Sequence, residues 1–298
     1  MRHTFLFSLF LLLFGSLAGC PSAADDDDSA ANDDDSVAND DDSAANDDDS
    51  AANDDDSASN DDDSAGDDDD ATDPSLDSCA IALEDACADI VVDAPGADSE
   101  VPFRDPLRAV NGVRGGGVGG GSLDVFSLDW TTGATLTLRW SNRRVLNAVG
   151  PDFVVFENPF EYSGPDSVFM DLVVVELSID GMTWVAFPHD YVSDDESTYS
   201  TDPVDWPGFA GASPVLLHEE DNPVPPTDPQ LAGGDAFDLD DLPAEGLAGT
   251  IREEGFLFLR LTAAPSLANP DTGEPYVADP VSNGADIDGV YARLLEIE

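Results

Sequence analysis

Two acidic residues close to the C-terminus have types and a spacing that suit a chemical role. Asp286 and Asp288 are separated by one apolar residue, Ile287. In an extended segment, residues i and i+2 point to the same side, so both carboxylates would face one way while Ile287 enters the core. Two like charges this close repel unless a cation neutralises them or water screens them. This segment is therefore the first candidate for binding a divalent cation.

Other oxygen donors in the chain would be able to complete such a site. Acidic residues are concentrated in residues 235–241, and a Glu-Asn pair lies in a Phe-Glu-Asn-Pro-Phe segment. Carboxylate and amide oxygens are hard ligands that suit Ca²⁺. The ligands expected for a structural calcium ion are Asp286, Asp288, Asp235, Asp238, Glu157 and Asn158. Acidic residues are so frequent in this chain that plain surface acidity is the alternative.

Patterns for catalysis are weak. His189 and His218 are the histidines outside the N-terminal segment, and neither stands in a triad or a zinc motif. The glycines of residues 115–121 are not followed by Gly-Lys-Ser or Gly-Lys-Thr, so they do not indicate a phosphate-binding loop. We therefore expect a protein that is not an enzyme, and a hydrolase is the least favoured function.

The segment Ser193–Pro229 is rich in Pro, Asp and Gly and is predicted to be a long loop. Irregular segments of this length in a compact domain usually have a function or are stabilised by a metal. The segment contains Tyr199, Trp206 and Phe209, and Tyr191 lies just before it. These rings would either stack on sugar rings or pack the loop onto the domain, and packing is the favoured alternative.

Strands must position these residues. Residues 135–140 alternate between apolar and polar, whereas 153–156 is a continuous apolar run typical of a core strand. Asp180-Gly181 supplies the residues of a tight turn. Strands are predicted at 135–140, 153–156, 172–179, 183–187, 256–262 and 289–297. Because no helical pattern lies between them, residues 75–298 are predicted to form an all-β, jelly-roll-like β-sandwich with long loops.

A resemblance to known domains supports this fold. Val175–Trp184 contains a Ser-x-Asp-Gly-x-x-Trp hairpin and resembles the strand–turn–strand of discoidin-like, galactose-binding-like jelly rolls. Residues 88–298 resemble a family of bacterial cell-surface lipoproteins, first named from leptospiral sequences, whose function is not established. The motifs that carry this wider resemblance are Gly119–Leu128, Gly150–Phe160, Ala232–Leu239 and Ala285–Val290. The family's closing motif often reads Phe-Asp-Leu-Asp; here Ala and Ile replace the Phe and Leu, and both Asp remain. The resemblance implies a fold and a location, and little about activity.

The N-terminus has the pattern of a lipoprotein signal. A basic start precedes an uncharged apolar run, Thr4–Phe14, which is too short to span a bilayer. Leu17-Ala-Gly-Cys20 follows and resembles a lipobox, in which the Cys is lipidated and becomes the mature N-terminus. We expect residues 1–19 to be a signal peptide and Cys20 to anchor the chain in the cell envelope. Pro21, instead of Asp, favours the outer membrane or cell surface.

Residues 20–74 are predicted to be the lipidated Cys and a disordered, acidic stalk. An Asn-Asp-Asp-Asp-Ser unit recurs every seven residues, but the repeat lacks the apolar residues of a coiled-coil seam. Residues 23–73 contain 24 Asp and no basic residue, so their charges repel and little apolar surface can be buried. Specific calcium repeats are the alternative, although Gly is nearly absent.

Two cysteines remain besides Cys20. Export would place Cys79 and Cys87 where disulfides persist, so we expect them to be bonded to each other. In a straight helix their Cα atoms would lie about 12 Å apart. A disulfide spans roughly 4.4–6.8 Å, so this segment would have to fold back as a compact loop.

Charge limits the partners of the protein. After the 24 Asp of the stalk are set aside, 41 of the 65 acidic residues remain, against ten Arg and no Lys. Because no basic patch is present, nucleic acid is excluded as a partner. The sequence leads us to expect a membrane-anchored surface lipoprotein that presents a non-enzymatic binding or adhesion module. Its partner would be a glycan or another cell-surface molecule, with carbohydrate- or calcium-dependent binding. A structural envelope lipoprotein without a soluble ligand is the alternative.

Overall fold

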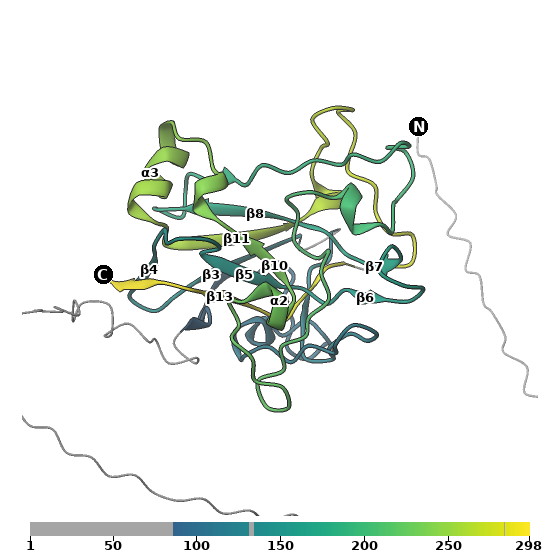
Figure 1. The fold of residues 1–298 in the computed structure, drawn as a ribbon, viewed down its shortest axis with the longest axis horizontal. Coiled ribbons are helices and arrows are strands. Elements are labelled where there is room, and N and C mark those ends of the chain that lie inside the picture. The colour runs from purple at the N-terminus through teal and green to yellow at the C-terminus, as the bar shows by residue number, and fades with distance from the viewer. Residues whose placement is uncertain (1–85, 131–133, 283) are drawn as a thin grey trace, which may run out of the picture. The chain divides into compact units, whose positions relative to one another are not determined.

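Antiparallel strands make up most of the regular structure (Figure 1), which confirms the all-β prediction. The computed structural model describes residues 86–130, 134–282 and 284–298, which belong to one unit of the chain, Asp69–Glu298. The predicted signal peptide, the acidic stalk and two of the predicted site residues, Cys20 and Cys79, lie outside the described residues.

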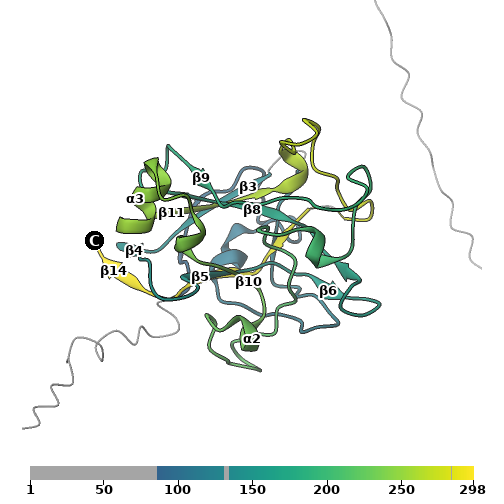
Figure 2. The same ribbon diagram turned by 45° about the horizontal axis from the view of Figure 1, so that its top comes forward.

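Two main sheets form a sandwich. The larger sheet has five strands in the order β1 (Ile90–Asp93), β3 (Thr135–Arg139), β11 (Phe258–Ala263), β8 (Val173–Ser178) and β9 (Val185–Ala186). The smaller sheet has the order β10 (Asp235–Phe237), β5 (Phe153–Phe156) and β13 (Gly289–Ala292). Figure 2 shows strands of the larger sheet in one layer and β5 and β10 in the other. Their eight strands match the number in a jelly roll.

The remaining elements are short and lie around the sandwich. Three two-stranded sheets pair β2 (Phe126–Ser127) with β12 (Asp286–Ile287), β4 (Arg143–Val145) with β14 (Leu295–Ile297), and β6 (Phe160–Glu161) with β7 (Val168–Phe169). The helices are η1 (Pro106–Val110), η2 (Pro203–Asp205), α2 (Pro229–Ala232), η3 (Leu239–Asp241), α3 (Gly246–Glu254) and η4 (Ala264–Ser266). The nine-residue helix α3 was not expected from the sequence. Figure 1 places α3 and the β6–β7 hairpin at opposite ends of the sheets.

The main core lies between the two sheets. The larger sheet contributes alternate residues of β3, β8 and β11, as the alternation in the sequence predicts. These buried residues are Leu136, Leu138, Val173, Val175, Leu177, Leu259 and Leu261. The smaller sheet contributes Phe153 and Val155 from one face of β5, while Val154 and Phe156 on its other face enter a second cluster. Strand β5 is thus covered on both faces, which explains its continuous apolar sequence.

The β8–β9 connection is longer than the predicted tight turn, because residues 179–184 separate the two strands and only Gly181 of the Asp180-Gly181 pair has a positive φ. Gly181 has a φ of 70°, and the Asp180 carboxylate accepts hydrogen bonds from the Met182 and Thr183 amides at 2.8 Å. The Ser178 hydroxyl accepts one from the Gly181 amide at 2.9 Å. Trp184 then lies against the Arg260 guanidinium, 4.2 Å from the ring centroid. The Ser-x-Asp-Gly-x-x-Trp pattern therefore encodes a self-contained turn with a ring that packs on the exposed face of the sheet.

Candidate functional site

Three acidic side chains form the most unusual electrostatic feature of the described residues, and we call them the carboxylate cluster: Glu157, Asp171 and Asp286. Glu157 directly follows β5, and Asp286 begins β12, just before the strand that pairs with β5. The Asp286 amide donates to Glu157 Oε1 at 2.7 Å. Asp171 lies between β7 and β8. The fold therefore brings carboxylates from three separate segments to one place.

The Gly211 backbone covers this cluster closely. A Cβ at Gly211 would stand 2.6 Å from the carbonyl oxygen of Asp171 and 3.4 Å from Glu157 Oε2. The φ of Gly211 is 95°, in the region that favours glycine. A side chain at this position would push the covering loop away from both acids, so glycine permits the close approach.

Glu157 is the most deeply buried member of the cluster. It is 3% exposed, and no donor among the described residues lies within hydrogen-bond distance of its Oε2. Burial raises the pKa of Glu157 well above its usual value, and the charges of Asp171 and Asp286 raise it further. A buried carboxylate without a partner is costly, so this group needs a proton or a cation.

The pKa values of Asp171 and Asp286 are also raised. Burial raises the pKa of Asp171 to about 8; a hydrogen bond from Ser282 opposes this shift, and the charges of Asp286 and Asp279 add to it. Burial also raises the pKa of Asp286, against hydrogen bonds from Ser127 and Asn158. The charges that act on Asp171 are thus all negative among the described residues.

Three of the six predicted calcium ligands come together in the structure, and the other three lie in separate hydrogen-bond networks. Glu157, Asn158 and Asp286 come together, and the Asn158 amide also donates to the Ser122 carbonyl oxygen at 3.1 Å. Among the described residues, no three His, Cys, Asp or Glu side chains stand ready to hold a metal ion as they lie. Any cation site here would therefore need side-chain rotation or neutral oxygen ligands.

Asp288 does not join Asp286. The Asp288 carboxylate is fully buried and accepts the Arg114 amide with both oxygens, at 3.0 and 3.1 Å. Burial raises its pKa to about 7, opposed by the Arg114 amide and charge and assisted by the Glu219 charge. Ile287 lies in the core as predicted, but the two acids stand in different networks. The chain changes its pairing partner between them, from β2 to β5.

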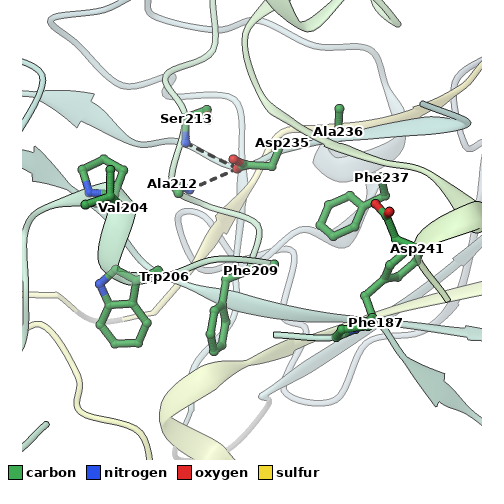
Figure 3. A pocket seen from close by; sticks show the side chains of 13 residues that line it. Phe187, Val204, Trp206, Phe209, Ala212, Ser213, Asp235, Ala236, Phe237 and Asp241 are labelled. Carbon is green, nitrogen blue, oxygen red and sulfur yellow. Dashed lines mark hydrogen bonds between the residues drawn. The ribbon is translucent and has the colours of Figure 1, made fainter. Parts of the chain in front are cut away.

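Asp235 and Asp238 also have partners elsewhere. Asp235 Oδ2 accepts the amides of residues 211–213, at 2.7, 3.0 and 3.4 Å, two of which appear in Figure 3. This carboxylate holds the loop whose Gly211 covers the cluster. The Asp238 carboxylate accepts the Asp240 amide at 2.9 Å and caps η3. Both acids have structural roles in the described residues.

The cavity beside Asp235 is lined by core aromatic rings (Figure 3). It has a volume of about 670 Å³, and its walls include Phe187, Trp206, Phe209 and Phe237. All four rings are almost fully buried. The Asp235 carboxylate and the four rings already have partners within the fold, and the exposed Asp241 is the second carboxylate that lines this cavity.

Three of the four loop aromatics pack the loop onto the domain. Tyr191, Trp206 and Phe209 are 1–3% exposed and belong to one buried cluster. Tyr191 stacks on Trp206 with centroids 3.9 Å apart, and Trp206 meets Phe209 edge-on at 5.5 Å. Tyr199 is partly buried against the same cluster. Packing, the alternative favoured from the sequence, is therefore correct for these three rings.

A second pocket, which we call the Tyr162 pocket, was not predicted from the sequence. It has a volume of about 680 Å³ and lies beside the β6–β7 hairpin. Its walls are Tyr162, Phe169, Ser197, Thr198, Tyr199, Thr201 and residues 277–281. Tyr162 is 60% exposed. No sequence pattern links these distant segments; an aromatic residue in the turn of a short hairpin was the available signal.

The Tyr162 pocket adjoins the carboxylate cluster. Asp279 lines the pocket, and its charge raises the pKa of Asp171. Tyr199 lines it too, and its pKa is raised by burial and then by the charges of Asp171, Asp279 and Glu157. These two residues therefore line the pocket and interact electrostatically with the buried acids.

Cys87 is buried at the β13 edge of the smaller sheet, where its backbone forms an isolated β-bridge with Tyr291. Burial raises the pKa of its thiol to about 12, and the Glu219 charge adds to the shift. Because Cys79 lies outside the described residues, the disulfide between them stays a prediction.

Comparisons with known proteins give no match: no family model, no curated protein and no solved structure is significantly similar to the chain. The resemblance to bacterial cell-surface lipoproteins therefore stays a prediction. Within the part of the chain that the structure describes, no helix has the length and apolar character needed to cross a bilayer.

Proposed function

We propose that this protein is a lipid-anchored surface lipoprotein whose β-sandwich binds carbohydrate, without catalysis, in the Tyr162 pocket. One observation carries the proposal. An exposed Tyr162 ring stands in a pocket with Phe169, Tyr199 and the carboxylate of Asp279. Ligand pockets commonly combine aromatic walls with a few polar groups that fix orientation.

The chemistry of the walls suits a sugar ring. The apolar face of a pyranose can lie against Tyr162 or Phe169, since an aromatic side chain offers a large apolar face. Sugar hydroxyls can donate to Asp279 and exchange hydrogen bonds with Thr201. The pocket volume of about 680 Å³ falls in the range of small-molecule sites, about 300–1,000 Å³.

The charge of the protein restricts the class of glycan. The chain has a formal net charge of −55, and the pocket itself contains Asp279. Repulsion between like charges disfavours uronic acids and sulfated or sialylated sugars. We therefore expect neutral glycans or glycans with a free amino group to bind.

The predicted anchor and stalk fit a display role. Two or three acyl chains on Cys20 would hold the chain at a membrane, since each buried CH₂ contributes about 0.8 kcal/mol. A stalk of roughly 50 residues at about 3.3 Å each reaches at most about 170 Å. Such a stalk would carry the domain away from the lipid surface. Cys20→Ser should release the protein from membranes or leave it unprocessed, which fractionation with detergent measures.

A glycan array tests binding. The mature chain with Cys20→Ser, free of acyl groups, should bind a subset of neutral or amino glycans. Adding Tyr162→Ala should lower binding at least tenfold, because the exposed stacking surface is lost. Phe103→Ala is the matched control, since Phe103 is 45% exposed on a different loop. If the parent chain binds no glycan, the proposal is wrong and the structural envelope role is favoured.

A further inference from the structure

We propose that Glu157, Asp171 and Asp286 bind one Ca²⁺ ion beside the backbone of Gly211. The starting point is the unpartnered oxygen of Glu157. Its Oε2 is buried and accepts no hydrogen bond from the described residues. Oε2 lies close to Gly211: a Cβ added to Gly211 would be near both Oε2 and the Asp171 carbonyl oxygen. A buried carboxylate oxygen without a donor, in a group that also feels the charges of two other acids, is unfavourable without a counter-charge.

Either a proton or a cation would neutralise the cluster. Two carboxyl groups that share a proton form a short oxygen–oxygen hydrogen bond. Glu157 Oε2 accepts no hydrogen bond from the described residues. Two oxygens that bind the same Ca²⁺ each lie about 2.3–2.6 Å from the ion, so they are held farther apart than in a hydrogen bond. An oxygen without a donor is open to an ion, and the metal titrations below separate binding of a cation from binding of a proton.

The ligand set suits Ca²⁺ better than Mg²⁺. Because no three acidic, His or Cys side chains are preset for a metal in the described residues, binding requires side chains of the cluster to turn. Backbone carbonyl oxygens, such as that of Asp171 beside Gly211, are further ligands for a cation. Ca²⁺ accepts six to eight oxygens in flexible geometry, whereas Mg²⁺ demands a near-ideal octahedron. An adaptable site of this kind favours the larger ion.

The site is distinct from the acidic stalk and from Asp288. The stalk is rich in Asp but has no aromatic residue. Asp288 is a buried acid two residues from Asp286, yet both its oxygens accept the Arg114 amide. Asp288 therefore serves as a control for the effect of removing a buried negative charge close by. The proposal does not depend on carbohydrate binding, because it is tested without any glycan.

Thermal melting of the mature Cys20→Ser chain tests the site. Melting temperatures are compared in EDTA, in Mg²⁺ and in Ca²⁺ at pH 7.5 and constant ionic strength, because screening alone stabilises an acidic domain. A ligand that binds only the folded state at a hundredfold excess over its Kd should raise the melting temperature by about 5–10 °C. We expect this rise with Ca²⁺ and a smaller one with Mg²⁺.

Variants locate the effect. Glu157→Gln and Asp171→Asn should each remove most of the calcium-specific rise without lowering the melting temperature in EDTA, because they remove repulsion. Asp288→Asn should keep the rise, even if it lowers stability overall. If Glu157→Gln fails to fold, Asp171→Asn still decides, since Asp171 lies outside the strands.

Terbium luminescence gives an independent measurement. Tb³⁺ replaces Ca²⁺ and emits when a nearby aromatic ring is excited, so the stalk contributes no signal. The parent chain should show sensitised emission that Ca²⁺ displaces, and Asp171→Asn should lose at least 80% of it. Equal melting temperatures in EDTA and Ca²⁺, or a calcium rise that survives in Asp171→Asn, would overturn the proposal and leave protons to neutralise the cluster.

Discussion

Strand β5 has a buried acid at each end, and the two acids are held in opposite ways. Asp152 precedes the strand and is fully buried; its two oxygens accept the Ala148 and Leu239 amides at 2.6 and 2.7 Å. Glu157 follows the strand and is 3% exposed, but only its Oε1 has a donor. Burial alone therefore does not identify a functional acid.

The difference lies in what the fold offers each carboxylate. Backbone amides satisfy Asp152, so its role is to join two loops to the end of β5. Glu157 instead meets two further acids, and its second oxygen is left without a donor. A carboxylate with two donors is a structural clamp, whereas one with a vacant oxygen beside like charges is a candidate ligand for a cation.

The largest effect is expected when the two hydrogen bonds accepted by Asp152 are removed. Asp152→Ala should reduce the free energy of unfolding by about 2–5 kcal/mol, because two buried amides each lose an acceptor at about 1–3 kcal/mol. Glu157→Gln in EDTA should change it by less than about 1 kcal/mol, since the amide oxygen can still accept from Asp286. Urea unfolding measures both. Equal losses in the two variants would mean that the two acids are held alike.

The second prediction concerns how the stability contributed by Asp152 depends on pH. Burial raises the pKa of Asp152 to about 6, opposed by the Leu239 and Ala148 amides and assisted by the charges of Asp238 and Asp240. The folded state therefore holds a proton that the unfolded chain releases near pH 4. The protonated Asp152 therefore contributes to the free energy of unfolding. This contribution is fully present below pH 4 and is lost as the pH rises through 6.

The expected size of this loss is roughly 1–3 kcal/mol, at about 1.4 kcal/mol for each unit of pKa shift. Urea unfolding of the parent chain and of Asp152→Asn, from pH 4 to pH 8 at constant ionic strength, measures it. The general repulsion of an acidic chain acts on both proteins, so the difference in slope isolates Asp152. Parallel curves would contradict the prediction.

The smallest effect concerns an acid that is paired with a side chain. Glu176 receives two hydrogen bonds from Arg260, at 2.6 and 2.7 Å, on the outer face of the larger sheet. Arg260→Lys removes the two-point contact and weakens the packing on Trp184, which should cost about 0.5–1 kcal/mol. Urea unfolding in low and high salt measures the change. A loss as large as that of Asp152→Ala would show that a partly buried ion pair rivals buried amide clamps here.

Much of the sandwich was predictable because its signals are local. Alternation placed Leu136, Leu138, Val175 and Leu177 on the core side, and the continuous apolar run of β5 matched a strand covered on both faces. Residues 289–297 were predicted as one strand, but the structure divides them into β13 and β14, which pair with different partners. Helix α3 escaped prediction because its sequence combines two glycines with few apolar residues.

The candidate site was only partly predictable. The sequence pointed to Glu157, Asn158 and Asp286 as separate oxygen donors, and the fold brings these three together. Asp171 was missed because it stands alone between apolar residues, where no spacing marks it. Asp288 was grouped with Asp286 because both were expected on one strand face, a rule that assumes an uninterrupted strand.

The sequence by itself determined the elements whose contacts are short in range, such as the Ser178–Trp184 hairpin, in which each hydrogen bond spans two or three residues. Tertiary structure alone decided which acids remain without donors. Glu157 and Asp286 are 129 residues apart, and their meeting depends on strand register and on the close approach of Gly211. The sequence shows that a residue has a carboxyl group, but the solvation and the partners of that group are decided only when distant segments pack around it.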